Sequence, residues 1–502
     1  MPAAEPNAVI DQGAFKHKII AALWRAVDAR PEILSATLAG SFARGTTLEG
    51  ISDIDTICVV DALDAERFET IQDAFRHELA PVLEAAGWAL RINPTLGPLK
   101  FNDAHTAVLH LMLYSADGHR EHVINSPFTC LDWQRSTIWH GVPMAEIYPV
   151  FSLQPRHFFG ARRSARDYLA DLGAGVVSYR ELHFDGGYHE VKLGKPMSVR
   201  DRHEFAYHIF RFLMQNLLKL VQRRNAVADG EELLAEYGAV FPSGMSTIAP
   251  LYRELARRKQ VADFSDPVPD LLERVTAFAQ AFEAQFRHAF EHDAVRHVAI
   301  RHAATAMNTG SGTGARLQGR SDPSILSLAP EVITQTRSVC VAQGIVRVLV
   351  SPLRRTRETM AAMLPDLTAV ADPRLSEIDY GTCEGLTAAE AMARHPELAQ
   401  GWAAGQDPVF PGGESSSQVR ARALTVLDDL AGAEPTAICT HNVVLREILG
   451  ELMQVPPSER HRLRIPHAQP INLVWSRRFG WFADLDAGLE RHLFTGFLKG
   501  SR

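Results

Sequence analysis

Hydrophobic residues along the chain follow two patterns that predict different elements. Short apolar runs, which are typical of strands buried in a sheet, occur at 34–40, 56–60, 106–114, 298–300, 346–350 and 436–439. Longer stripes with an apolar residue every three or four positions, which are typical of amphipathic helices, occur at 8–29, 201–221 and 271–286. Together the patterns predict a multidomain α/β protein whose middle part is helical.

The length of 502 residues exceeds what one hydrophobic core supports, so we expect several domains. The patterns predict three regions, which cover residues 1–150, 151–294 and 295–502. The first combines a small mixed sheet with helices, the second is helical, and the third alternates strands and helices as α/β domains do.

Composition narrows the class of protein. Hydrophobic residues make up 46% of the chain and charged residues 22%, and the formal net charge is −7. An acidic chain is not built to bind nucleic acid over its whole surface, although a local basic groove is compatible with this charge. The cysteines are scattered without a C-x-x-C pair, and neither a signal pattern nor an apolar run of about 18 residues occurs. We therefore expect a cytoplasmic protein without a zinc site, a disulfide framework or a membrane span.

Candidate phosphate chemistry in the first region follows the strand predicted at 34–40. This strand ends at Gly40 and Ser41, whose small side chains let a phosphate approach the backbone closely. Asp53 and Asp55 lie on an extended segment, so both carboxylates point to one face, about 6.6–6.8 Å apart along the strand. Such a pair can hold Mg²⁺ against a nucleoside triphosphate and support displacement at the α-phosphate. An Asp-x-Asp on its own is more often a solvated strand end.

The order of strand, Gly-Ser, Asp-x-Asp and second apolar strand is far more restrictive than either motif alone. Over roughly residues 35–115 the chain resembles the polymerase-β-like nucleotidyltransferase superfamily. The resemblance implies that Gly40 and Ser41 bind the triphosphate. It also implies that Asp53 and Asp55 hold Mg²⁺ or Mn²⁺ while a nucleotidyl group passes from an NTP to a hydroxyl or phosphate of an acceptor.

One position departs from this family's pattern. The family has a third carboxylate on a later antiparallel strand, but the corresponding strand at 106–114 presents His110. Asp103 in the preceding loop is a poor substitute. We expect His110 either to act as a metal ligand or base, or to be a structural histidine. The alternative is that the first domain binds nucleotide but does not catalyse a transfer.

The middle region carries apolar stripes that build a helical core and imply no cofactor. Helices that follow a nucleotidyltransferase core often form the wall of the acceptor site in that superfamily. By this resemblance residues 151–294 are the acceptor side. A glycine-rich turn at 185–187 and scattered basic residues could contact a phosphorylated acceptor, although such a scatter is typical of a solvated surface.

Two histidines of the third region each follow a predicted strand. His302, preceded by Arg301, follows the run at 298–300, and His441 follows the run at 436–439. Ligands of α/β sheets bind at the carboxyl ends of strands, where helix N-termini also favour anions. A guanidinium can bind the oxygens of a phosphoryl group while a neighbouring imidazole accepts that group covalently.

Further segments at 351–359, 373–385 and 411–415 lie in a fixed order between these histidines. The whole pattern resembles the histidine phosphatase (phosphoglycerate-mutase-like) superfamily, an α/β three-layer fold. The resemblance implies no metal or cofactor for this domain. The residues that it places in the site are His302 as the phosphoryl-accepting nucleophile, Arg301, Arg355 and His441 as phosphate-binding groups, Asn308 as a substrate-binding residue and Glu377 as the acid for the leaving oxygen. Such an acid needs a raised pKa, which burial can supply. Glu384 is the less favoured acid, and we expect it to have a structural role.

Ala303 and Asn442 stand where the family usually has glycine directly after each active histidine. Alanine adds only a methyl group, and asparagine tolerates left-handed backbone angles better than most residues. We expect both to be compatible with the fold, although together they could narrow the pocket. The alternative is that this region has the phosphatase-like fold but only binds its ligand, without catalysis.

The two resemblances together predict a bifunctional enzyme. One part would transfer a nucleotidyl group to a small, phosphorylated acceptor, and the other would hydrolyse a phosphomonoester through a phosphohistidine. RNA end processing is the second choice, because it predicts a basic, aromatic-lined groove and the aromatic residues here lie mostly in helical core stripes. The third alternative is a phosphatase whose first domain only senses nucleotide.

Overall fold

The computed structural model describes residues 12–45, 53–101, 105–151, 153–160, 164–223, 228–261, 263–309 and 315–498. The chain forms two compact units. The first comprises Met1–Val150 and His157–Glu283, and the second comprises Phe151–Arg156 and Ala284–Arg502. The first two regions expected from the sequence thus share one compact unit. Asp103 lies outside the described residues.

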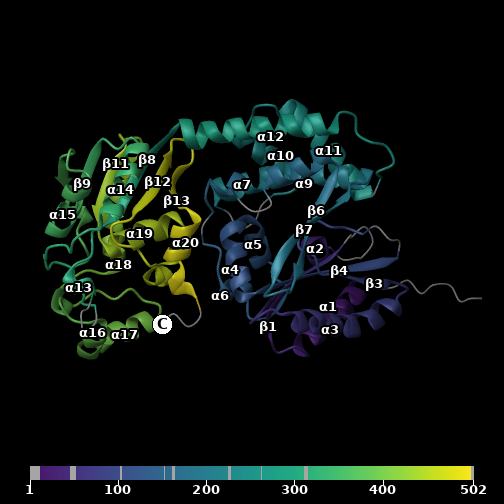
Figure 1. Ribbon diagram of the computed structural model, residues 1–502, viewed down its shortest axis with the longest axis horizontal. Coiled ribbons are helices and arrows are strands. Elements are labelled where there is room, and N and C mark those ends of the chain that lie inside the picture. The colour runs from purple at the N-terminus through teal and green to yellow at the C-terminus, as the bar shows by residue number, and fades with distance from the viewer. Residues whose placement is uncertain are drawn as a thin grey trace, which may run out of the picture. The chain divides into compact units, whose positions relative to one another are not determined.

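A five-stranded mixed sheet forms the centre of the first unit (Figure 1). In the spatial order β3-β4-β2-β1-β5, its strands are β3 (Ala89–Asn93), β4 (Thr106–Ser115), β2 (Ile54–Val60), β1 (Ile33–Ala39) and β5 (Trp139–Gly141). β1 and β2 are antiparallel, whereas β2 and β4 are parallel. The mixed sheet is confirmed, but the expectation that the strand at 106–114 is antiparallel is wrong. The helix and strand between β2 and β4 provide the crossover connection that parallel pairing requires.

Helices build most of the remainder of the first unit. Their bounds are α1 (Gln12–Asp28), α2 (Gly40–Arg44), α3 (Ala65–Glu84), α4 (Ala116–Asn125), α5 (Pro127–Gln134), α6 (Met144–Ile147), α7 (His157–Gly160), α8 (Ala165–Ala174), α9 (Val199–Gln222), α10 (Gly230–Val240), α11 (Met245–Val261) and α12 (Leu271–Arg287), which crosses the unit boundary. α1 and α3 pack together along the sheet. The apolar stripes of α1 and α3 are buried because they face this contact.

The middle region is helical as expected, except for one antiparallel hairpin. β6 (Val176–His183) pairs with β7 (His189–Pro196), and the glycine-rich turn joins them. Gly186 and Gly187 both have positive φ there, which a turn of this kind demands. α9 begins at a capping box formed by Ser198 and Asp201.

A six-stranded sheet forms the centre of the second unit, in the order β10-β9-β11-β8-β12-β13. The strands are β8 (Ala294–Arg301), β9 (Arg347–Val350), β10 (Ala369–Ala371), β11 (Thr436–Thr440), β12 (Pro470–Ser476) and β13 (Gly480–Asp484). The first four in the spatial order are parallel, and β12 and β13 are antiparallel. The short apolar runs of the sequence are these buried parallel strands.

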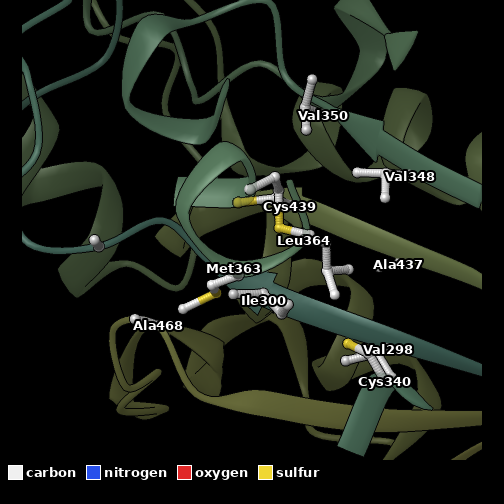
Figure 2. Close-up of a cluster of buried hydrophobic side chains, with 12 residues drawn as sticks. Val298, Ile300, Cys340, Val348, Val350, Met363, Leu364, Ala437, Cys439 and Ala468 are labelled. Atoms are coloured by element: carbon white, nitrogen blue, oxygen red, sulfur yellow. The ribbon is translucent and has the colours of Figure 1, made fainter. Parts of the chain in front are cut away.

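Helices lie on both faces of this sheet, so the unit has the three layers expected from the sequence (Figure 1). They are α13 (Ala306–Thr309), α14 (Pro330–Ala342), α15 (Arg354–Met363), α16 (Ala388–Arg394), α17 (Pro396–Ala403), α18 (Ser416–Leu430), α19 (Asn442–Leu452) and α20 (Ala487–Leu493). On one face, Val298 and Ile300 of β8 pack with strand residues of β9 and β11 and with Met363 of α15 (Figure 2). In the described part of the chain, no helix combines the length and apolar character of a membrane span.

Replacing Ile300 with alanine tests the importance of this core, because its fully buried side chain fills the contact between β8 and α15. We expect Ile300→Ala to lower the free energy of unfolding of the second unit by about 2–5 kcal/mol. Val370→Ala, on the half-exposed end strand β10, should change it by less than about 0.5 kcal/mol. Urea unfolding of the full chain measures both. An equal effect of the two substitutions would contradict the described packing.

Candidate active sites

Two neighbouring parallel strands bring the histidines of the second unit together. β8 ends at Arg301 and β11 ends at Thr440, and these two residues are partners in the strand register. His302 and His441 follow directly, so they leave the same edge of the sheet, and their ring centroids lie 5.1 Å apart. Both side chains are buried. Two imidazoles thus share one enclosed site.

Arg355, at the start of α15, is fully buried beside His441. Its Nε donates a hydrogen bond to His441 Nδ1 at 3.1 Å, and its terminal nitrogens donate to the carbonyl oxygens of Gly319 and Ser321. Arginine has no lone pair to offer, so His441 Nδ1 must accept and the ring proton lies on Nε2. That Nε2–H is buried and has no hydrogen-bond partner among the described residues. A buried donor of this kind points to an acceptor on a ligand.

His302 has the opposite tautomer. Its Nδ1 lies 2.7 Å from the backbone oxygen of Ala303, which can only accept, so Nδ1 carries the proton and Nε2 keeps its lone pair. Burial and the charge of Arg355 hold the pKa of His302 well below its ordinary value. Its ring is therefore neutral near pH 7, as a nitrogen nucleophile must be.

The backbone around His302 is fixed by two further side chains. The Thr359 hydroxyl accepts a hydrogen bond from Ala303 N at 2.9 Å, and His467 Nδ1 donates to the His302 carbonyl at 2.8 Å. Sequence reasoning missed His467, because it lies in a loop without a strand-end pattern. The methyl group of Ala303 is buried, so the family's glycine is replaced here without disrupting the turn.

Arg301 extends from the last residue of β8 on the same edge. Its Nη1 donates to the Ile465 carbonyl at 2.8 Å, while its buried Nε has no partner among the described residues. Burial lowers the pKa of Arg301 to about 10, so it is still cationic at neutral pH. Arg301 and Arg355 therefore place two positive charges beside two neutral imidazoles, an arrangement suited to an anion.

Glu377 is the buried carboxylate of this cluster. Its oxygens accept hydrogen bonds from the backbone nitrogens of Ile378 at 3.0 Å and Val443 at 3.2 Å. Burial raises the pKa of Glu377, against the opposing effects of these bonds and of Arg355 and Arg301. The side chain is thus suited to hold a proton.

Two other residues of the predicted site have structural contacts. Asn308 Oδ1 accepts hydrogen bonds from the backbone and hydroxyl of Thr305, which closes the turn after His302. α13 begins only at Ala306, so His302 does not open a helix directly, unlike His441 at the N-cap of α19. Glu384 accepts from backbone nitrogens of residues 319–321, which supports its structural interpretation.

In the first unit, Gly40 and Asp55 meet where β1 ends beside β2. Gly40 has φ 69°, and a Cβ on it would collide with Asp55 Oδ2, so glycine is required on both counts. Ser41 follows as an exposed residue of α2. Asp53, just before β2, is 7% exposed, and its Oδ1 has no hydrogen-bond partner among the described residues. An unpartnered buried carboxylate oxygen next to a second carboxylate fits a divalent cation.

His110 does not fit the role of a metal ligand in this arrangement. The parallel register places it opposite Asp55, with its Nδ1 3.0 Å from Asp55 Oδ1 and its Nε2 2.9 Å from the Thr95 carbonyl. Both partners are acceptors, so both ring nitrogens donate and no lone pair is left for a metal. Burial alone would lower the pKa of His110, but the hydrogen bond and charge of Asp55 raise it. The ring acts as a cation that holds Asp55.

A partly buried ion pair beside Asp53 escaped sequence reasoning. Lys100 Nζ lies 2.7 Å from Glu204 Oε2 of α9, and Arg200 also bonds Glu204. Burial alone would lower the pKa of Lys100, but Glu204 and Asp53 raise it. Glu204 is separated from Asp53 by about 150 residues of sequence, so no local pattern could associate them. No group of three or more His, Cys, Asp or Glu side chains arranged for a metal occurs within the described residues.

A pocket of about 520 Å³ contains Gly40 and Asp55. α9 contributes His208, Arg211 and Lys219 to its lining. Lys219 is buried and donates to Asp132 at 2.7 Å. The middle region thus lines the pocket that contains Asp55, and its part in acceptor binding stays a prediction.

Sequence models of two families match the chain. The nucleotidyltransferase domain matches residues 20–96, and the histidine phosphatase superfamily (branch 1) matches residues 298–485. The chain therefore contains one domain of each family, as the motifs predicted, and both are families of enzymes.

Individual relatives match parts of the chain. The probable phosphoglycerate mutase GpmB of Yersinia enterocolitica is 29% identical over 178 residues, which cover 33% of this chain and 78% of that protein. The bifunctional protein Rv2228c of Mycobacterium tuberculosis is 34% identical over 126 residues, 24% of this chain and 34% of that protein, so the match spans about a third of its length. Among solved structures, the mycobacterial glucosyl-3-phosphoglycerate phosphatase Rv2419c has 23% identity and a TM-score of 0.32, and the alignment covers 38% of this chain and 98% of the other.

The raised pKa of Glu377 predicts a specific pH dependence for the second unit. The ordinary pKa of this carboxyl is 4.5, so an acid role would be lost as pH rises through the raised value. The pKa of His302 lies well below 6.5, so its ring stays neutral as pH rises above 6.5. We expect Glu377→Gln to remove this decline and to lower kcat/KM for an alkyl phosphate by about 10²–10⁴-fold. The loss should be smaller for p-nitrophenyl phosphate, whose leaving group needs no proton. Steady-state kinetics across pH measure kcat/KM for both substrates, and Glu397→Gln, at an exposed residue, is the control. Equal losses of kcat/KM on both substrates would contradict an acid role.

Proposed function

We propose that the protein is a bifunctional enzyme, a metal-dependent nucleotidyltransferase joined to a phosphomonoester hydrolase that works through a phosphohistidine. The proposed hydrolase activity rests on one observation, the tautomers of the two histidines. His302 offers the lone pair of Nε2, and His441 offers an unpartnered Nε2–H in the same buried site. One ring is suited to attack phosphorus and the other to bind a phosphate oxygen.

The first step forms a bond between His302 Nε2 and phosphorus and breaks the bond from phosphorus to the leaving oxygen. Arg301, Arg355 and the His441 Nε2–H bind the phosphoryl oxygens and stabilise their charge. Glu377 gives its proton to the leaving oxygen, so the product departs as an alcohol.

The second step reverses the role of Glu377. As a carboxylate it takes a proton from a water molecule that attacks the phosphohistidine, which releases inorganic phosphate and restores both side chains. The burial that raises the pKa of Glu377 makes both directions of this proton transfer accessible.

In the first unit, we propose that Asp53 and Asp55 hold Mg²⁺ or Mn²⁺, and that Gly40 and Ser41 bind the triphosphate of an NTP. A bound divalent ion would supply charge stabilisation at the α-phosphate. Gly40 leaves space beside Asp55, and α9 provides basic groups across the pocket. A small, phosphorylated acceptor suits this pocket and the acidic chain.

A second candidate for the first unit is nucleotide sensing without turnover. It is favoured by His110, which stands in place of the family's third carboxylate and binds Asp55 Oδ1. The same histidine leaves this unit without the base that such a carboxylate would supply to an attacking hydroxyl. Nucleotide binding without pyrophosphate release in the presence of acceptors would favour this candidate.

Replacing His302 with alanine tests the phosphatase. Because the nucleophile is removed, phosphate release from p-nitrophenyl phosphate should fall to background, while pyrophosphate release from NTP should be unchanged. His288→Ala, an exposed histidine of the same unit, serves as control. Colorimetric phosphate assays on the full chain measure the change, and residual turnover in His302→Ala would disprove the assignment of the nucleophile.

Replacing Asp53 and Asp55 with asparagine tests the first unit. Loss of the carboxylates should remove several kcal/mol of transition-state stabilisation, so pyrophosphate release should fall by about a hundredfold or more. Phosphatase activity should persist. Incubation with each labelled NTP and a metabolite extract, followed by mass spectrometry of the adducts, reports the transfer. The exposed Asp73→Asn is the control, and unchanged transfer in the double variant would refute the role of the pair.

A further inference from the structure

Two separate stretches of the chain build the second unit. Besides residues 284–502 it includes residues 151–156, and the chain on either side of that short stretch belongs to the first unit. The short stretch also lies outside the region that matches the histidine phosphatase superfamily, residues 298–485. We call its described residues, Phe151 and residues 153–156, the tie. The second unit thus contains a piece that the family's sequence pattern does not include.

Polar side chains of the tie are bonded to α20 and to the backbone before it. Gln154 is 1% exposed, and its Oε1 accepts a hydrogen bond from Leu485 N at 2.7 Å. Its Nε2 donates to Glu490 Oε2 of α20 at 3.3 Å, and Arg156 forms an ion pair with the same carboxylate. Glu490 is buried, so loss of the tie would leave a buried carboxylate without the cation that the tie supplies.

An aromatic contact extends the tie to the turn after α20. The Phe151 ring centroid lies 5.6 Å from that of Phe494 and 4.6 Å from that of Phe497, and both partners are buried. Phe497 ends the short 3-10 helix η5 (Thr495–Phe497). With seven residues, α20 is too short to be stable without packing. The tie therefore helps to keep α20 and η5 docked.

The docked α20 is linked to the phosphatase site by backbone hydrogen bonds. The Leu493 carbonyl at the end of α20 accepts a hydrogen bond from Arg464 N at 2.9 Å. The next residue, Ile465, accepts one from Arg301 Nη1 through its carbonyl at 2.8 Å. Arg301 directly precedes His302 and is one of the proposed phosphate-binding groups. The position of α20 thus bears on the segment that holds this side chain.

Both flanks of the tie are held by α5 in the first unit. Gln134 Nε2 donates to the Tyr148 carbonyl at 2.9 Å, and Gln134 Oε1 accepts from Val150 N at 2.9 Å. Beyond the tie, the Phe158 ring centroid lies 5.0 Å from that of Phe128 on α5. Phe128 also lines the pocket in which we propose that the nucleotide binds. One helix therefore lines that pocket and fixes both ends of the tie.

We propose that the tie couples the two sites, so that a nucleoside triphosphate bound in the first unit and a phosphate bound in the second each strengthen the binding of the other. A nucleotide in the pocket restricts α5, α5 holds the flanks of the tie, and the tie keeps α20 docked. Linkage makes the effect reciprocal. The inference rests on the proposed function of both units.

Hydrogen exchange of the ligand-free full chain tests the route. Gln134→Ala removes both bonds to the flank, and Gln154→Ala removes the bonds to Leu485 and Glu490. We expect each to raise the exchange rates of the amides of 487–497 about fivefold or more, the effect of one lost hydrogen bond. Gln134 is the sharper test, because it lies in the first unit and its described hydrogen bonds go to residues of that unit.

Gln72→Ala is the matched control, since the Gln72 amide bonds the Phe68 carbonyl within α3 of the same unit. It should leave the exchange rates of 487–497 unchanged. Unchanged exchange in both Gln134→Ala and Gln154→Ala would overturn the tie. This measurement needs no ligand or turnover, so a chain that shows the exchange effect but hydrolyses no phosphomonoester refutes the proposed phosphatase and not the tie.

Calorimetry on the full chain measures the coupling itself. Each of the four α,β-methylene NTP analogues is titrated with Mg²⁺, with and without saturating inorganic phosphate. We expect phosphate to lower the Kd of the nucleotide about fivefold or more, and the nucleotide to lower the Kd of phosphate by the same factor. The factor should fall to about one in Gln134→Ala and Gln154→Ala and persist in Gln72→Ala. A factor of one in the unaltered chain, or a factor that survives both tie substitutions, would overturn the proposal.

Discussion

The hydrogen bond from Arg355 to His441 Nδ1 is the interaction on which the second unit's site depends. It fixes the tautomer of His441 and leaves the Nε2–H as a buried donor without a partner among the described residues. Arg355 is itself fully buried, and its other donors are held by backbone carbonyl oxygens that carry no net charge. The guanidinium charge is therefore not neutralised by a bonded carboxylate, and an anion at this strand edge would lower the cost of its burial.

Burial has opposite effects on the pKa values of the proposed acid, Glu377, and the proposed nucleophile, His302. It lowers the pKa of His302 and raises the pKa of Glu377, since in each case the charged form is disfavoured. The neutral forms of both groups are the ones that the first step of phosphoryl transfer requires. One buried environment thus favours the neutral form of both groups, as the proposed mechanism needs.

The two units differ in how the charges of their site residues are compensated. In the second unit, Arg301 and Arg355 donate to backbone carbonyl oxygens and not to carboxylates, an arrangement that suits an anion. In the first unit, the carboxylates are partly compensated by the protein, because His110 binds Asp55 and Lys100 lies near Asp53. That compensation reduces the attraction of this carboxylate pair for further positive charge.

The sequence by itself determined that the chain contains two domain families, and it predicted that His302 and His441 follow strands of one sheet. Apolar runs that end in Arg301-His302 and in Thr440-His441 indicate buried parallel strands, and parallel strands place their carboxyl ends at one edge. Strand direction in the first sheet was decided by the crossover through α3, which made β4 parallel and set His110 against Asp55. The Lys100–Glu204 pair and the contribution of α9 to the pocket likewise depended on the tertiary structure. Their residues are far apart along the chain, so only the packing of non-local elements brings these charges together. A strand-end motif is local, so its sequence alone predicts where its side chains lie.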